Sequence, residues 1–122
     1  MKKNHIILAF ALLLSASLLT AQKTQSFEVK SPDGNIILKV ESGAKLLWSV
    51  EHKGEQIIAP SAISLQLGDG VILGDKPAIK SAKTVEINTS FNAINYKQAT
   101  VTDHCNQLTL NCKGDYGVIF RV

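Results

Sequence analysis

Hydrophobic and polar residues alternate along most of the chain after residue 26. In the stretch FEVK, the apolar residues Phe27 and Val29 are separated by one polar residue. In NIILKV, every second residue from Ile36 onward is apolar. A period of two places neighbouring side chains on opposite faces of a β-strand. The same alternation recurs at Leu46/Trp48/Val50, Ile63/Leu65/Leu67, Val85/Ile87/Phe91, Leu108/Leu110/Cys112 and Val118/Phe120/Val122. The pattern therefore predicts a series of short strands.

Turn-forming residues separate these stretches, and no segment after the first 21 residues keeps a helical periodicity over three turns. The turn signals are Pro32-Asp33-Gly34, Ser42-Gly43, Lys53-Gly54, Gly68-Asp69-Gly70, Gly74-Asp75-Lys76-Pro77 and Gly114-Asp115. Most connections are too short for the crossovers that parallel strands need. We therefore expect an all-β fold, an antiparallel β-sandwich.

Residues 1–21 have the layout of a secretory signal peptide. Lys2 and Lys3 precede an apolar run over residues 6–14, and small residues lead up to Ala21. The apolar run is shorter than the roughly 20 residues that span a membrane. We expect cleavage after Ala21, export to the periplasm or the exterior without a membrane anchor, and one folded domain over residues 22–122.

The charge of the exported domain gives no support for a nucleic-acid-binding role. The leader holds two of the 13 basic residues and none of the 10 acidic ones, so the net charge of the remainder is about +1. The lysines are scattered rather than clustered, whereas nucleic-acid-binding proteins carry a basic patch.

Export makes a disulfide possible, but the spacing of the two cysteines does not favour one. Cys105 and Cys112 are seven residues apart. On one strand they would face opposite sides and lie roughly 23 Å apart, beyond the reach of a disulfide. We expect two free thiols, with Cys112 in the core beside Leu108 and Leu110.

The chemistry-bearing residues do not form a recognisable catalytic site. Glycoside hydrolysis needs two carboxyl groups roughly 5 to 9.5 Å apart across the sugar. The acids here fall on outward strand positions or in turns and are expected to be solvated: Glu28, Glu41, Glu51, Glu86, Asp33, Asp69, Asp75 and Asp115. We predict no catalytic, cofactor-binding or metal-binding residue in this sequence.

Three further sets of residues are weaker candidates for chemistry. Asp69 and Asp75 flank an apolar triplet, but they lack the dense oxygen ligands of a calcium loop. His52 falls in a turn, and His104 precedes Cys105, so on a strand the two side chains point apart and cannot act as a nucleophile pair.

The aromatic residues do not form a sugar-stacking platform. Trp48 shares its parity with Leu46 and Val50, which places it in the core. Tyr96 and Tyr116 are expected to be exposed, but two tyrosines do not make a binding face.

Three stretches resemble the N-terminal domain of glycoside hydrolase family 97. They are SPDGNIILKVE, LLWSVEHKGEQIIAPSAISLQL and LTLNCKGDYGVIFRV. In that family a Ser-Pro-Asp-Gly/Asn turn is followed by strands and by a segment that here runs from Lys53 to Leu65. In it, Lys53-Gly54 forms a hairpin turn and Pro60-Ser61 re-aims the chain into the next strand.

The resemblance implies a partial β-super-sandwich of the galactose-mutarotase-like type. Such proteins are exported, calcium-dependent, exo-acting α-glycosidases with a catalytic (β/α)8 barrel, which carries the catalytic carboxylates. The implied role of this chain is that of a non-catalytic N-terminal domain that packs on the barrel of the same polypeptide and supports hydrolysis of oligosaccharides. Calcium is expected in the full-length enzyme and not in this chain. The last strand reaches Val122 without a closing turn, so the domain is expected to be incomplete at its C-terminal end.

An alternative remains open. The chain could be a stand-alone exported β-sandwich that binds a carbohydrate or a protein without catalysis.

Overall fold

The described part of the chain consists of β-strands joined by turns. The computed structural model describes residues 23–94, 97 and 99–122. The predicted signal peptide over residues 1–21 and Tyr96 lie outside these residues. Within them the strands are β1 (Gln25–Lys30), β2 (Ile36–Ser42), β3 (Leu46–His52), β4 (Glu55–Ala62), β5 (Leu65–Gln66), β6 (Ile72–Leu73), β7 (Ile79–Asn92), β8 (Thr100–Cys112) and β9 (Tyr116–Arg121).

Strands β1 to β4 form one antiparallel sheet in chain order. The first turn is the one that the sequence predicted: the Gly34 amide donates to the Ser31 carbonyl at 2.8 Å, and the buried Ser31 hydroxyl accepts the Ile36 amide at 2.9 Å. Lys53 and Gly54 both have positive φ angles, 50° and 85°, in the two-residue turn between β3 and β4. Such turns match the twist of a hairpin, so the prediction of a hairpin turn at Lys53-Gly54 is confirmed.

Strand β4 differs from the prediction. The sequence predicted that the chain would change direction at Pro60-Ser61, but β4 continues through Pro60 to Ala62. The strand can include Pro60 because an irregularity in the register with β3 leaves Ala59 and Pro60 without cross-strand partners. Proline lacks an amide proton and is tolerated at bulges and on edge strands. The chain then leaves this sheet, so the prediction of one strand through Ile63, Leu65 and Leu67 is wrong. In this stretch only Leu65–Gln66 forms a strand, which pairs with β6 in a separate hairpin. Leu65 is 61% exposed.

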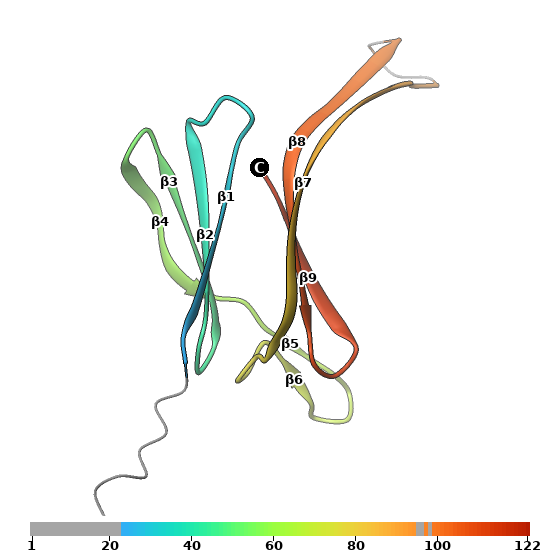
Figure 1. Cartoon of the computed structure of the whole chain (residues 1–122). Coiled ribbons are helices and arrows are strands. Elements are labelled where there is room, and N and C mark those ends of the chain that lie inside the picture. The colour runs from blue at the N-terminus through green and yellow to red at the C-terminus, as the bar shows by residue number, and fades with distance from the viewer. Residues whose placement is uncertain (1–22, 95–96, 98) are drawn as a thin grey trace, which may run out of the picture.

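Strands β7, β8 and β9 form a second antiparallel sheet, with β8 in the middle. The hairpin of β7 and β8 is much longer than β9 and curves away beyond the first sheet (Figure 1). The pairing of Leu108 with Phe120 and of Leu110 with Val118 fixes the register of β9.

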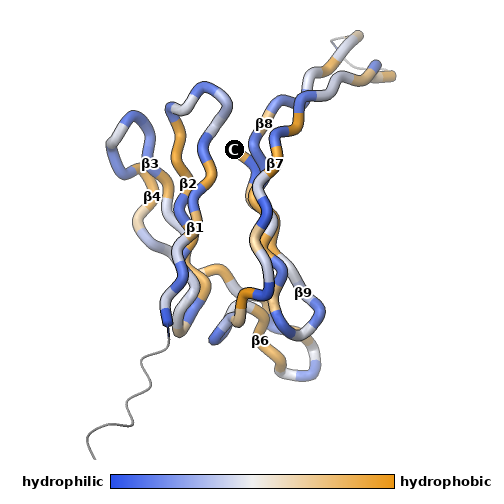
Figure 2. The backbone as a smooth tube through the Cα atoms, viewed as in Figure 1, coloured by the Kyte–Doolittle hydropathy of each residue, from blue (hydrophilic) through white to orange (hydrophobic). Residues whose placement is uncertain are grey.

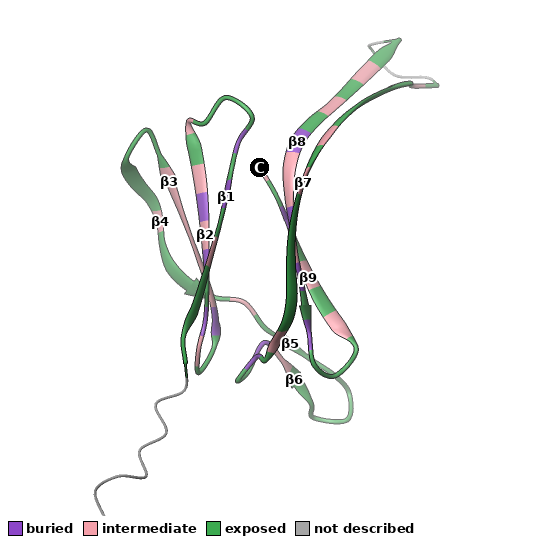
Figure 3. Ribbon diagram, in the orientation of Figure 1, coloured by how far each residue is buried: buried purple, intermediate pink, exposed green. Residues whose placement is uncertain are grey.

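The core lies between the two sheets. Val29, Leu38, Val40 and Leu46 come from the first sheet, and Leu108, Leu110 and Phe120 from the second. Buried positions lie on β1 and β2 of the first sheet and on β8 and β9 of the second (Figure 3), and hydrophobic positions lie on the same strands (Figure 2). Trp48 packs against this cluster, as predicted. The antiparallel all-β sandwich is thus confirmed for the described residues.

The part of the chain that the structure describes contains no helix that is long and apolar enough to cross a membrane.

Candidate functional site

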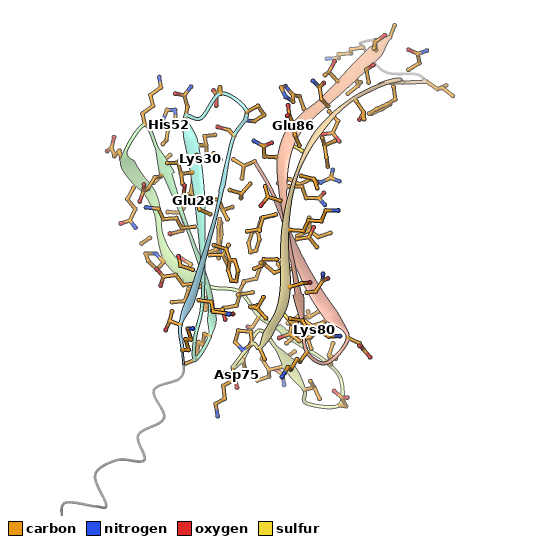
Figure 4. All side chains as sticks on the ribbon, in the orientation of Figure 1. Glu28, Lys30, His52, Asp75, Lys80 and Glu86 are labelled. Carbon is orange, nitrogen blue, oxygen red and sulfur yellow. The ribbon has the colours of Figure 1, made fainter. Side chains whose placement is uncertain are left out.

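Most acidic side chains are held by a local basic or polar partner. Glu28 pairs with Lys30 at 3.2 Å, Glu86 with His104 at 3.0 Å, and Glu51 binds Lys39 across the β2–β3 ladder. Figure 4 shows Glu28, Asp75 and Glu86 far from one another on different elements. This arrangement does not bring these carboxylates together across a sugar-sized gap, as glycoside hydrolysis requires.

Asp33 stabilises the turn between β1 and β2. Its carboxylate accepts hydrogen bonds from the Ser31 hydroxyl, from the Asn35 amide at 3.1 Å and from the Asn35 side chain at 2.7 Å. The hydrogen bond from Ser31, followed by those from Asn35, lowers the pKa of Asp33 to about 2. The role of Asp33 is therefore structural, because a carboxylate held in its ionised form cannot serve as a general acid near neutral pH.

Cys105 and His104 lie on opposite faces of β8. The His104 ring contacts Glu86, whereas the Cys105 thiol lies 3.6 Å from an Asp103 carboxylate oxygen. Burial, followed by the nearby charge of Asp103, raises the pKa of the Cys105 thiol. Nucleophilic cysteines need the opposite shift, so the geometry agrees with the expectation that these residues are not a catalytic pair.

Both cysteines are free and Cys112 is buried, as predicted; Cys105 is buried as well. Cys112 lies on the face of β8 that carries Leu108 and Leu110. Cys105, of opposite parity, lies on the other face, opposite Ile87 of β7.

No group of three or more metal-ligating side chains converges among the described residues. The Asp69 carboxylate accepts the Val71 amide at 3.1 Å within its own turn, and the backbone of Asp75 forms an isolated antiparallel β-bridge with that of Lys45. The residues present do not fit a calcium site, which takes six to eight oxygen ligands.

One hollow lies at the end of the second sheet beside the turn between β8 and β9. It measures about 530 Å³ and is lined by Lys80, Ser81, Asn111, Cys112, Asp115, Tyr116 and Gly117. Tyr116 was expected to be exposed, but it is half-buried because its hydroxyl reaches across to accept the Gly74 amide at 3.4 Å. Burial is the main cause of the raised pKa of Tyr116. With Asp115 as its one carboxylate, this hollow lacks the paired acids of a glycosidase.

A second hollow of about 330 Å³ lies where the chain passes from the first sheet to the β5–β6 hairpin. Gly74 lines it, accepts the Leu46 amide at 3.0 Å, and has a φ angle of 89°. A methyl group on Gly74 would overlap the carbonyl oxygen of Ile63. The sequence indicated only a turn here, since a close approach between residues far apart in the chain leaves no local pattern.

His52 is the last residue of β3 and not part of the turn that follows, because it still pairs with Glu55.

Comparison with known proteins gives a consistent result. The family model described as "Glycosyl-hydrolase 97 N-terminal" matches residues 29–122. A retaining alpha-galactosidase of Bacteroides thetaiotaomicron is 31% identical over 114 residues, which are 93% of this chain and 17% of that protein.

Solved structures share the fold. A beta-arabinopyranosidase superposes with a TM-score of 0.70 and 25% identity over 80% of this chain and 16% of its own. A glycoside hydrolase family 97 enzyme from Pseudoalteromonas sp. strain K8, in complex with acarbose, has a TM-score of 0.64 and 22% identity over 78% of this chain and 15% of its own. The chain spans about a sixth of the length of these proteins.

Proposed function

Because the chain belongs to the glycosyl-hydrolase 97 N-terminal family, we propose that it is the non-catalytic N-terminal part of a larger, exported α-glycosidase. The observation that carries this proposal is the family match over residues 29–122, which takes in nearly all of the described sandwich. The role proposed for it is structural: it holds and supports a catalytic barrel that lies elsewhere in the same polypeptide.

The non-catalytic role is supported by the state of the acidic residues. Asp33 is fixed in a turn with a pKa of about 2, and Glu28, Glu51 and Glu86 are each engaged by a basic side chain. A glycosidase instead needs one carboxyl group with a raised pKa facing a second carboxylate. We place both catalytic carboxylates in the catalytic portion of the full-length protein.

The proposed substrates are oligosaccharides that end in an α-linked galactose or glucose. The relative from Bacteroides thetaiotaomicron is named for retaining cleavage of α-galactosides, and this supports the choice of test compounds. The proposed enzyme is calcium-dependent. Its ligands would come from outside the described residues, which contain no fitting cluster.

The proposed location is the periplasm or the cell exterior, reached by means of the signal peptide expected over residues 1–21. Within the barrel-bearing enzyme the sandwich is proposed to be part of a β-super-sandwich of the galactose-mutarotase-like type. The support for this finer class is the family match together with the two facing antiparallel sheets.

The test compares two purified proteins on nitrophenyl α-galactoside and nitrophenyl α-glucoside. One is the long polypeptide that carries this sequence, and the other is residues 22–122. We expect turnover by the long polypeptide, lost after chelation of calcium, and none by residues 22–122. Turnover by residues 22–122 would contradict the non-catalytic role. Absence of turnover by the long polypeptide would contradict the glycosidase proposal and favour the alternative of a binding module.

A further inference from the structure

Strand β7 turns Val85 and Ile87 away from the core, although Ile79 at its start packs against it. Leu108 of β8 is 2% exposed in the core, and its partner in register on β7 is Thr84. Residues that oppose one another in a ladder share a face, and neighbours along a strand face opposite sides. Val85 and Ile87, which have the opposite parity to Thr84, therefore lie on the face that points away from the first sheet.

The same outward face continues onto β8. Ile87 lies opposite Cys105, and Phe91 lies opposite Val101. These residues form an apolar surface that is divided by the Thr89–Asp103 pair, which lies on the same face between Ile87 and Phe91. It lies toward the far end of the β7–β8 hairpin, where Figure 1 shows no other labelled strand on the side away from the first sheet. We call it the outer apolar surface; it consists of Val85, Ile87, Phe91, Val101 and Cys105.

The strand pairing that forms this surface is regular. The pairing of β7 with β8 runs without a shift from Ser81 to Asn92. A slip of one residue would exchange the two faces of the strand, so the hydrophobic pattern normally fixes which face is buried. Here the register is regular, yet Phe91 stays 57% exposed within the described chain. An apolar face on a regular strand indicates a second layer of packing.

The polar groups beside this surface are already satisfied by one another. Arg121 lies 3.5 Å from the Asp103 carboxylate and donates from Nε to the Gln107 side chain at 2.8 Å. Buried polar groups are costly only when they lack partners. A covering segment could therefore be apolar and need not supply partners for these three side chains.

The position of Val122 favours a covering segment from the same polypeptide. Its amide and carbonyl pair with those of Asn106, next to Cys105 on β8. Chain that follows Val122 thus starts at the border of the outer apolar surface. The relative that is 31% identical has about six times the length matched here, so a long covering portion is available in such a protein.

We propose that the outer apolar surface is a docking site for an apolar element of the polypeptide that follows Val122. The proposal rests on the proposed function, because it names the face through which this sandwich holds the rest of the enzyme. The occupant is intramolecular, and its contact buries Phe91 and Ile87.

Hydroxyl-radical footprinting of the long polypeptide tests this directly, with two phenylalanines compared in one sample. In the described chain Phe91 is more exposed than Phe27, which is half-buried against the core. Docking predicts that Phe91 is oxidised more slowly than Phe27. Oxidation of Phe91 severalfold faster than Phe27 would overturn the proposal. If the protection of Phe91 disappears on dilution, a second copy of the chain covers the surface. That result would also overturn the proposal of an intramolecular contact.

A pair of variants in the long polypeptide tests whether the docking contact of Phe91 contributes to thermal stability. Phe91→Ser is expected to lower the thermal midpoint, whereas Ser90→Ala, a change at the next residue on the opposite face, is expected to leave it unchanged. Equal midpoints for both variants would count against docking. If the long polypeptide hydrolyses α-glycosides but Phe91 is freely oxidised, only the docking proposal fails. If Phe91 is protected without hydrolysis, only the proposed function fails.

Discussion

Thr84 on β7 lies directly opposite Leu108 on β8, so the buried leucine has a polar neighbour on that side of the ladder. On the other side its partner is Phe120 of β9, which is buried. The second sheet therefore contributes to the inter-sheet core mainly through β8 and β9. The free energy of unfolding should depend on these two strands.

Leu110→Ala should strongly destabilise the sandwich. Leu110 is fully buried, and removing such a side chain leaves a cavity that costs ~2–5 kcal/mol. Ile119→Ala is the matched control: Ile119 is 59% exposed on the neighbouring strand, and its loss should change stability by less than about 0.5 kcal/mol. Urea unfolding followed by the fluorescence of Trp48, at low protein concentration, measures both. Equal unfolding midpoints for the two variants would show that the core is elsewhere.

Gly74→Ala should be more harmful than Gly70→Ala. Both glycines have positive φ angles, 89° and 87°, so either substitution meets a backbone strain of ~1–2 kcal/mol. At Gly74 the added methyl also overlaps the Ile63 carbonyl, and such overpacking costs a further ~1–3 kcal/mol. At Gly70 nothing lies within 4 Å of the new methyl. Thermal melts of the two variants separate backbone strain from steric overlap. If Gly74→Ala is as stable as Gly70→Ala, the close contact between Gly74 and the Ile63 carbonyl is refuted.

The turn at Asp33 should make stability depend on pH in acid. The pKa of Asp33 in the folded chain is about 2, below the 3.8 that is ordinary for an aspartate, because Ser31 and then Asn35 donate to the ionised form. A depressed pKa contributes stability that is present above pH 3.8 and is lost as the pH falls through about 2. Asp33→Asn should flatten the dependence of the urea midpoint on pH in that window. A carboxyl titration by NMR with a midpoint near 3.8 would contradict the hydrogen-bonded turn.

Residues 22–122 alone should behave as an incomplete sandwich. Strand β9 pairs only with β8 within the described chain, and β8 continues past it from Thr100 to Cys105. Unpaired strand edges template association with other chains. We expect light scattering to show association, or a urea melt to show partial unfolding. A stable monomer with one cooperative transition would favour the stand-alone module.

The alternation of residues predicted the strands and the shared faces well. Pairs such as Val40 with Trp48 follow from patterns that are visible in each strand. Glycine at position 54, after Lys53, fixed a hairpin because few residues adopt the positive φ angles that such a turn needs. The separation of His104 from Cys105 was also predictable, since neighbouring side chains on a strand point to opposite faces.

Two features could not be read from local patterns. Alternation shows that Val85 and Ile87 share a face, but it does not show whether that face meets the other sheet, because the register with β8 decides this. The region around Ile63 and Leu65 alternates like a strand, yet the chain crosses between sheets there. The Ile63 amide binds the Leu46 carbonyl at 2.9 Å, which pulls it out of the expected strand.

Sequencing the DNA downstream of the Val122 codon would show whether this chain is part of a larger glycosidase. The account predicts an open reading frame that continues for several hundred codons, with alternating strand and helix patterns and paired acidic residues of a glycosidase barrel. A stop codon directly after Val122 would contradict it. The sandwich would then have no barrel to support, and binding rather than hydrolysis would be the function to examine.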